Sequence, residues 1–240
     1  MKKIICLLLV LACSFALFAC GDEELTDVQK TAQYYKNSLP TKIVTTSTQS
    51  IMNTSGVAVA ILNGKYELVT GTISGKLATV QTYEQDYIRD VSEGANAVIV
   101  GPINTESGSL EYLEGYGRRT NGGAWDANGL NFGPTAGSIA INLKDDLLTN
   151  VKYTTGANGT NTLTFTVPNA NIAAVFGANA DDAALLTASS DVEVAITNDG
   201  AFVNSITFSY SIAGTRYYPE RRVSMTTTYE YEVQNVELAH

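Results

Sequence analysis

Hydrophobic and polar residues alternate with a period of two over most of the chain from Thr41 onward, and this alternation predicts β-strands. In residues 163–167, leucine, phenylalanine and valine alternate with threonine, so we expect a strand with one buried and one solvent-exposed face. Pro168 is expected to end this strand, because proline cannot donate to a ladder. A long final strand, Val223–Val233, is expected to complete the sheet with its apolar residues on one side.

Two pairs of alternating segments are predicted to form β-hairpins. The first is expected over residues 57–68 around Asn63-Gly64, because this dipeptide accepts positive φ at both positions of a two-residue turn. The second is expected over residues 192–212, around Asn198-Asp199-Gly200.

One helix is predicted before the strands begin. Apolar residues recur at three- and four-residue spacing over Leu25–Ser38, and Pro40 is expected to close this helix. Thr26 and Gln29 have the spacing of a capping box, which marks a helix N-terminus.

Two acidic pairs are expected at the starts of short helices, because carboxylates favour a helix N-terminus. Asp145-Asp146 precedes two leucines, and Asp181-Asp182 begins the second of two short helices predicted over Asn169–Phe176 and Asp181–Thr187. Adjacent residues point in different directions in strands and helices alike. Neither pair is therefore expected to aim two carboxylates at one substrate.

These elements predict a mainly β (α+β) fold. We expect a single domain over residues 25–240 with one antiparallel, curved sheet, either half-barrel or barrel-like, because no repeat or long linker interrupts it. The N-terminal helix and the short helices near residues 169–187 complete it. A β-sandwich has the same alternating strands and is the alternative.

The first twenty residues have a different pattern. Two lysines precede an apolar run, Ile4–Phe18, that is shorter than the roughly 20 residues needed to cross a bilayer. Leu17-Phe18-Ala19-Cys20 resembles the lipobox of bacterial lipoproteins. We therefore expect residues 1–19 to be a removed signal peptide and Cys20 to be lipidated. A retained membrane anchor or an ordinary signal peptide is the alternative.

An acidic stretch follows the cysteine, so residues 20–24 are expected to form a lipidated tether. Asp22-Glu23-Glu24 resembles the surface-export signal of Bacteroidota-type surface lipoproteins. This resemblance implies a cell-envelope protein, anchored in the outer membrane by lipid on Cys20 and exposed on the outside of the cell. A solvated tether without an export role is the alternative.

The formal net charge of −9 disfavours nucleic acids and anionic membrane surfaces as partners. Removal of the signal peptide would make the protein more acidic, because it contains two lysines and no acidic residue. We expect a monomer that binds no nucleic acid and touches the membrane through its lipid.

The chain offers little for thiol or imidazole chemistry. Cys6 and Cys13 would leave with the signal peptide, Cys20 would be acylated, and the one histidine is the last residue, His240. These positions argue against Ser-His-Asp and Cys-His catalysis and against His-rich zinc sites. We therefore expect no enzymatic activity, no metal and no cofactor.

Residues 113–138 form a glycine-rich segment that cannot be a regular strand throughout. Aromatic rings on such a loop can cover an apolar ligand or stack on a sugar, and arginines can receive a carboxylate or phosphate. The alternative is a structural loop whose tryptophan closes the end of the core. The candidate ligand-binding residues are Tyr116, Arg118, Arg119, Trp125 and Phe132.

Arg118-Arg119 and Arg221-Arg222 are the two arginine doublets. Either could receive a ligand head group. The alternative is that both lie on strand edges, where charge deters strand-to-strand aggregation.

The order of these parts, from lipidated tether and helix to closing hairpin and strand, resembles that of the LolA/LppX-like lipoprotein half-barrels. Their curved sheet wraps a cavity for lipid or acyl chains. The resemblance implies a non-catalytic lipoprotein that binds an apolar or amphipathic ligand such as lipid. A surface glycan-binding or adhesive module is the alternative, because aromatic residues on an exposed loop also suit sugars.

Overall fold

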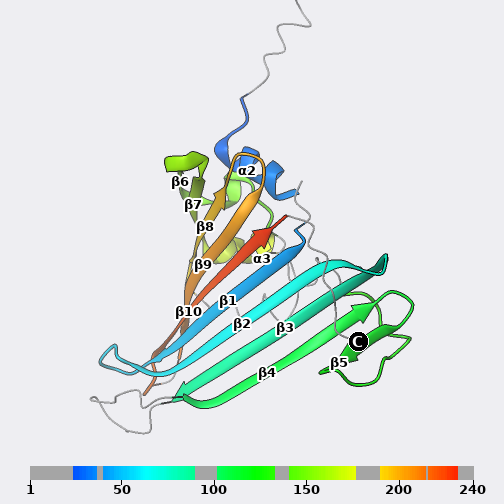
Figure 1. The fold of residues 1–240 in the computed structure, drawn as a ribbon. Coiled ribbons are helices and arrows are strands. Elements are labelled where there is room, and N and C mark those ends of the chain that lie inside the picture. Colours follow the sequence, from blue (N-terminus) through cyan, green and yellow to red (C-terminus); the bar gives the residue numbers. More distant parts are fainter. Residues whose placement is uncertain are drawn as a thin grey trace, which may run out of the picture.

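The computed structural model describes residues 24–36, 40–89, 102–132, 141–176, 190–214 and 216–231, which contain ten strands (Figure 1). The strands are β1 (Lys42–Met52), β2 (Ala58–Ile73), β3 (Lys76–Arg89), β4 (Pro102–Leu113), β5 (Gly117–Thr120), β6 (Thr149–Thr155), β7 (Asn161–Val167), β8 (Val192–Asn198), β9 (Val203–Ala213) and β10 (Glu220–Glu230). The helices are α2 (Asp27–Lys36) and α3 (Ile172–Phe176), with single 3₁₀ turns η1 (Asp145–Leu147), η2 (Ala157–Gly159) and η3 (Asn169–Asn171).

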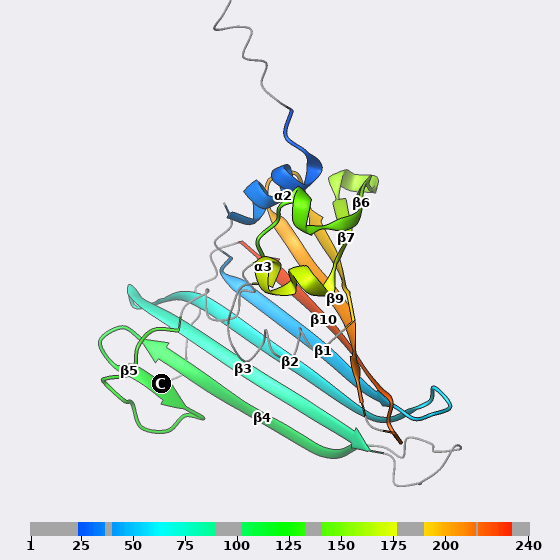
Figure 2. The same ribbon diagram turned by 180° about the vertical axis from the view of Figure 1, so that it is seen from behind.

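All ten strands belong to one antiparallel sheet, in the order β5-β4-β3-β2-β1-β10-β9-β8-β7-β6. The sheet is bent, with β1 and β10 in its middle, β2–β5 on one side and β6–β9 on the other (Figure 1). Figure 2 shows α2 and α3 on one face of this sheet, which we call the inner face. The prediction of a mainly β fold with a single curved antiparallel sheet is confirmed, and the β-sandwich alternative is wrong.

The hydrophobic core lies between the helices and the inner face of β7–β9. Leu163, Ile196 and Ile206 from these strands are each 0 % exposed, as is Ile172 of α3. Val28 of α2 packs into the same cluster. The predicted alternation of residues 163–167 is confirmed, because the threonines between the buried positions lie on the opposite, outer face. Burial of these side chains therefore holds the helices on one side of the sheet.

The capping box at the start of α2 is confirmed. The Gln29 backbone N–H donates to Thr26 Oγ1 at 3.1 Å, and the Thr26 backbone N–H donates to Gln29 Oε1 at 3.1 Å. Thr26 Oγ1 also donates to Asp145 Oδ2 at 3.0 Å, which ties the helix start to η1. Residues 37–39 lie outside the described residues.

We expect Thr26→Ala to lower the free energy of unfolding by about 1 kcal/mol, because it removes the cap from an otherwise unpaired N–H. Chemical denaturation monitored by circular dichroism measures this change. Thr26→Ser keeps the hydroxyl and should retain most of the stability. Equal losses in both variants would contradict a capping role.

The predicted hairpin at Asn63-Gly64 is wrong, because β2 runs through this dipeptide without a turn. Gly64 lies opposite Ser47 of β1 and Gln85 of β3, so partner strands on both sides hold it extended. The two-residue turn lies eleven residues downstream at Ser74-Gly75, where φ is 49° and 78°. Pairing with both neighbours overrides the local turn preference of Asn-Gly.

The second predicted hairpin is confirmed as β8 and β9. Asp199 Oδ1 accepts the backbone N–H groups of Ala201 and Phe202 at 2.9 and 2.8 Å, which satisfies the turn internally. These hydrogen bonds, above all that from Phe202, lower the pKa of Asp199 below its ordinary value.

The remaining predicted elements are confirmed where the structure describes them. Asn169–Phe176 forms η3 and α3, and Asp145-Asp146 begins η1. The predicted final strand exists as β10, but it begins at Glu220 instead of Val223 and ends at Glu230. It pairs with β1 and β9 and so joins the two sides of the sheet. Cys20, the signal peptide and the helix predicted over Asp181–Thr187 lie outside the described residues.

Candidate functional site

Three of the predicted loop residues, Tyr116, Arg119 and Trp125, form a cluster around β5, at one edge of the sheet. The rings of Tyr116 and Trp125 lie 5.9 Å apart, and the Arg119 guanidinium lies 4.6 Å from the centre of the Trp125 ring. The Lys76 ammonium lies 4.8 Å from the centre of the Tyr116 ring. Trp125 is half-buried here and is not a member of the hydrophobic core, so it does not close the end of that core.

Arg119 has an internal partner. Its Nε and Nη2 donate to Oε2 of Glu111 at 2.9 and 2.7 Å. The Glu111 residue is only 7 % exposed, so this carboxylate depends on the arginine for compensation. A ligand anion would have to compete with Glu111 for the same guanidinium.

Arg118 and Phe132 form a separate pair. The Arg118 guanidinium lies 5.4 Å from the centre of the Phe132 ring, and Phe132 packs against the hydrophobic core. Successive residues of a strand point to opposite faces, so Arg118 and Arg119 of β5 serve different sides of the sheet. The five predicted residues therefore do not converge on one site, and their role in binding stays a prediction.

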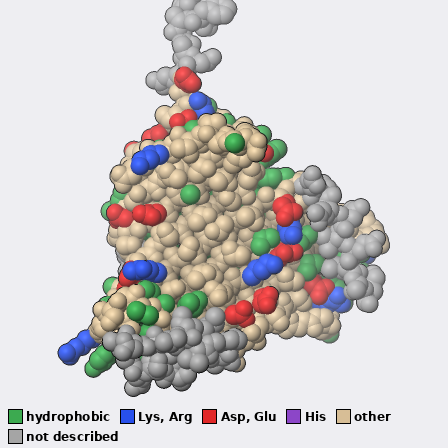
Figure 3. All heavy atoms as spheres, turned by 60° about the vertical axis from the view of Figure 1, so that its left-hand side comes forward, with side chains coloured by type: hydrophobic (Ala, Val, Ile, Leu, Met, Phe, Trp, Pro, Cys, Tyr) green, Lys and Arg blue, Asp and Glu red, His purple; other side chains and the backbone are tan. Residues whose placement is uncertain are grey.

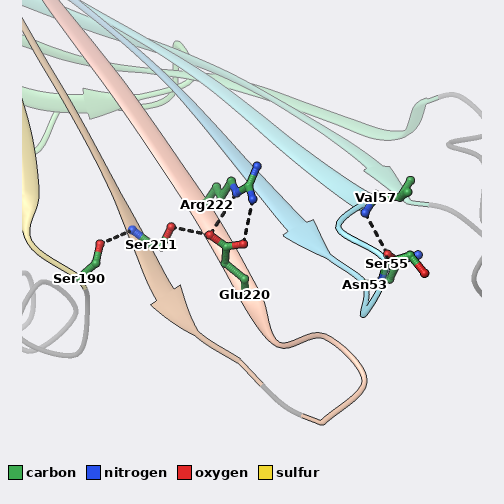
Figure 4. Close-up of polar contacts among 7 residues, drawn as sticks. All are labelled: Asn53, Ser55, Val57, Ser190, Ser211, Glu220 and Arg222. Atoms are coloured by element: carbon green, nitrogen blue, oxygen red, sulfur yellow. Dashed lines mark hydrogen bonds and ion pairs between the residues drawn. The ribbon is translucent and has the colours of Figure 1, made fainter.

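Arg221-Arg222 lies on β10 in the middle of the sheet, so the interpretation of this doublet as a strand edge is wrong. The Arg222 guanidinium pairs with Glu220 at 3.0 Å, and Ser211 Oγ donates to the same carboxylate at 2.7 Å (Figure 4). Hydrogen bonds from Arg222 and Ser211 lower the pKa of Glu220 below its ordinary value. Arg118-Arg119, by contrast, does lie on an edge strand.

The outer face carries shallow hollows lined mainly by hydroxyl groups. One, of about 430 Å³, lies over β1, β8, β9 and β10 and includes Ser190, Ser211 and Arg222. Another, of about 360 Å³, lies over β2–β4 and includes Lys65 and Glu84. Figure 3 shows a surface on which charged side chains are scattered among uncharged polar ones. Both hollows mix hydroxyl groups with side chains of positive and negative charge.

A more ordered arrangement lies on the inner face of β2–β4, beyond the part that α2 and α3 contact. Tyr66 of β2 lies directly opposite Tyr83 of β3, and Tyr83 lies opposite Gly108 of β4. Because side chains alternate along a strand, the residues two positions away share this face. We call this group the tyrosine face; it consists of Tyr66, Gln81, Tyr83, Gln85 and Tyr87, all half-buried.

The ring of Tyr83 reaches across to the neighbouring strand β4 and lies over Gly108. A Cβ atom at position 108 would lie 2.5 Å from Tyr83 Oη and 2.6 Å from its Cζ and Cε1, so the ring occupies the place of the missing side chain. Gly64 is similar, since a Cβ there would lie 3.4 Å from Tyr66 Cε2 and 2.9 Å from Ser47 Oγ. Glycine within a strand thus permits the close approach of an aromatic ring. The Tyr83 ring therefore covers the backbone of β4 at Gly108.

Amide side chains flank the rings. Gln85 Nε2 donates a hydrogen bond to Tyr66 Oη, which links β3 to β2 across the face. Gln81 and Gln85 precede and follow Tyr83 on the same side of β3. Each amide carries both donors and an acceptor, so the face combines flat apolar surface with hydrogen-bonding groups.

This face was not predicted from the sequence, because tyrosine is common in strands for packing reasons alone. A signal was nevertheless present, since Gln81, Tyr83, Gln85 and Tyr87 alternate with a period of two. The glycine of Asn63-Gly64 was assigned to a turn, whereas within a strand it indicates close approach of another group.

Comparisons with known proteins give no assignment. No protein-family model and no curated protein matches this chain. Among solved structures, the bifunctional dehydratase-cyclase domain in ambruticin biosynthesis is similar at 12 % identity, over 80 % of this chain and 76 % of that one, with a TM-score of 0.14.

The described residues contain neither a membrane-spanning helix nor a cluster of metal ligands. None of their helices has the length and apolar character needed to span a bilayer. No three of their histidine, cysteine, aspartate and glutamate side chains gather as the ligands of a metal ion would.

Proposed function

We propose that this protein is a non-catalytic, lipid-anchored envelope protein that binds a carbohydrate on the tyrosine face. The observation that carries the proposal is the position of the Tyr83 ring over Gly108, between Gln81 and Gln85. Sugars have apolar C–H faces and hydroxyl groups around their rims. An aromatic ring can pack against the C–H face of a sugar, and amide side chains can form hydrogen bonds with its hydroxyl groups.

Packing of the core favours a carbohydrate over a lipid as the ligand. A lipid-binding half-barrel needs an apolar cavity between its sheet and its helices. In the part of the chain that the structure describes, this space is filled by side chains such as Val175 of α3 and Val194 of β8, which are 0 % and 3 % exposed. The tyrosine face adjoins this packed region at Leu68, opposite Gln81, and mixes aromatic with polar groups.

The envelope location rests on the lipobox-like sequence ending at Cys20. Mass spectrometry of the N-terminal peptide of the membrane-extracted protein tests it. We expect a peptide that begins at Cys20 and carries acyl chains. A mature protein that begins at another residue would contradict the lipid anchor.

Titration calorimetry with a panel of oligosaccharides tests the binding function on the purified full-length protein. We expect at least one oligosaccharide to bind, and Tyr83→Ala to weaken it about tenfold, because stacking on one aromatic ring contributes about 1–3 kcal/mol.

Tyr83→Phe is the matched control, since it keeps the ring and should keep most of the affinity. The exposed Tyr116, which lies outside the tyrosine face, provides a second control as Tyr116→Ala. Binding that Tyr116→Ala weakens and Tyr83→Ala leaves unchanged would place the site on the glycine-rich loop and overturn the proposal.

A further inference from the structure

We infer that the ligand of the tyrosine face is an uncharged glycan segment, and that this face discriminates against acidic sugars. The inference rests on the proposed function and narrows it to a class of substrate. The structural feature behind it is the separation of charged from uncharged side chains between the two faces of β1–β4.

Four cross-strand rows make up the tyrosine face and its surroundings, each with one residue from β1, β2, β3 and β4. Of these described residues, Glu106 is the only charged one. The rows are Ile43–Leu68–Gln81–Leu110, Thr45–Tyr66–Tyr83–Gly108, Ser47–Gly64–Gln85–Glu106 and Gln49–Leu62–Tyr87–Asn104.

The outer face of the same strands is rich in charge. Lys65 and Glu84 lie directly opposite each other, and Lys42 pairs with Glu67 at 3.6 Å. Further charged residues at outer positions are Asp86 and Glu111. Residues of the two faces alternate along the same strands, so overall composition does not explain why the four inner-face rows contain a single charged residue.

An anionic sugar would lose hydration on this inner surface without gaining a cation. Burying a charged group is unfavourable unless an opposite charge or several hydrogen bonds compensate it. Inner-face cations lie at its margins: Arg118 stacks on Phe132, and the row beyond Gln49 and Tyr87 contains Arg221, opposite Ile51, and Arg89, opposite Ala60. Glu106, next to Gln85, would repel a carboxylate or sulfate.

Uncharged hydroxyl groups fit the same surface well. A sugar hydroxyl both donates and accepts a hydrogen bond, and an amide side chain can accept the one and donate the other. Gln81 supplies such an amide in the row on one side of the Tyr66–Tyr83 pair, and Gln85 and Gln49 supply two more in the first and second rows on the other side. The four rows carry amides and rings and no cation, so this part of the face selects for neutral sugars.

The test compares oligosaccharides of equal length that differ only at C6, namely glucose hexamers and glucuronate hexamers of the same linkage, together with the mannose and mannuronate pair. Titration calorimetry of the full-length protein measures each affinity at low salt, where charge effects are largest. We expect at least one neutral hexamer to bind ten or more times as tightly as its acidic counterpart.

Glu106→Arg provides the decisive variant because it places a cation on the face. We expect it to strengthen binding of the acidic hexamer at least tenfold. Glu84→Arg makes the same charge change on the outer face of β3 and should leave that affinity unchanged, so it controls for net charge.

The outcomes separate the inference from the proposed function. Acidic hexamers that bind the wild-type protein as tightly as neutral ones, with the same loss in Tyr83→Ala, would overturn the inference and leave the proposed function standing. Equal effects of Glu84→Arg and Glu106→Arg would also overturn it. Absence of binding by both classes of hexamer and by the wider oligosaccharide panel would overturn both.

Discussion

Replacement of Gly108 by valine should weaken carbohydrate binding about a hundredfold, more than loss of the Tyr83 ring itself. The valine side chain would occupy the space in which the Tyr83 ring now lies, since even a Cβ there would lie 2.5 Å from Tyr83 Oη. The Tyr83 ring would have to turn away from β4, and the branched valine side chain would cover the β4 backbone in its place. Both the aromatic platform and the space for the sugar above it would be lost.

The fold should tolerate this change, because valine is favourable in strands and the displaced ring is half-buried. Ser107→Val introduces the same side chain one residue away on the outer face, so it is the matched control and should leave the affinity unchanged. Titration calorimetry measures binding, and denaturation curves check folding. Normal binding by a well-folded Gly108→Val protein would show that the position of the Tyr83 ring has no part in recognition.

Leu163→Ala should lower the free energy of unfolding by about 2–5 kcal/mol, the range for loss of a fully buried leucine. Leu163 is 0 % exposed at the centre of the core and lies between Tyr153 of β6 and Ile196 of β8. The cavity left by alanine would lie beneath α2 and α3, whose packing on the sheet depends on this cluster. Urea denaturation measures the loss.

Thr162→Ala is the control for strand propensity, because Thr162 is the preceding residue and points to the outer face. This substitution should change the free energy of unfolding by no more than about 1 kcal/mol. A similar, small loss in both variants would mean that the space between sheet and helices is not tightly packed, and it would revive the possibility of a ligand cavity there.

Local sequence patterns predicted those elements whose turns and caps are made by nearby side chains. The β8–β9 hairpin was predictable because Asp199 satisfies its own turn, and the start of α2 because Thr26 and Gln29 bond to each other. Asn63-Gly64 misled because its conformation is set by pairing with β1 and β3, which no local pattern reveals.

The candidate site was harder to predict than the fold because it depends on register. Tyr66 and Tyr83 are far apart in sequence and meet only when β2 and β3 pair with the turn at Ser74-Gly75. The error at Asn63-Gly64 placed Tyr66 in a different hairpin and so separated the two rings. In contrast, the glycine-rich loop was conspicuous in sequence, yet strand alternation sends Arg118 and Arg119 to opposite sides.

The place of β10 has a consequence for how the molecule is made. Residues 42–52 find their second neighbour only in residues 220–230, after nearly the whole chain has been synthesised. Until then, each side of the sheet presents an open row of backbone hydrogen-bonding groups where β10 will insert, and such rows promote association between chains. Pairings so distant in sequence also form slowly. Assembly of this protein therefore depends on protection of two incomplete half-sheets until its last strand arrives.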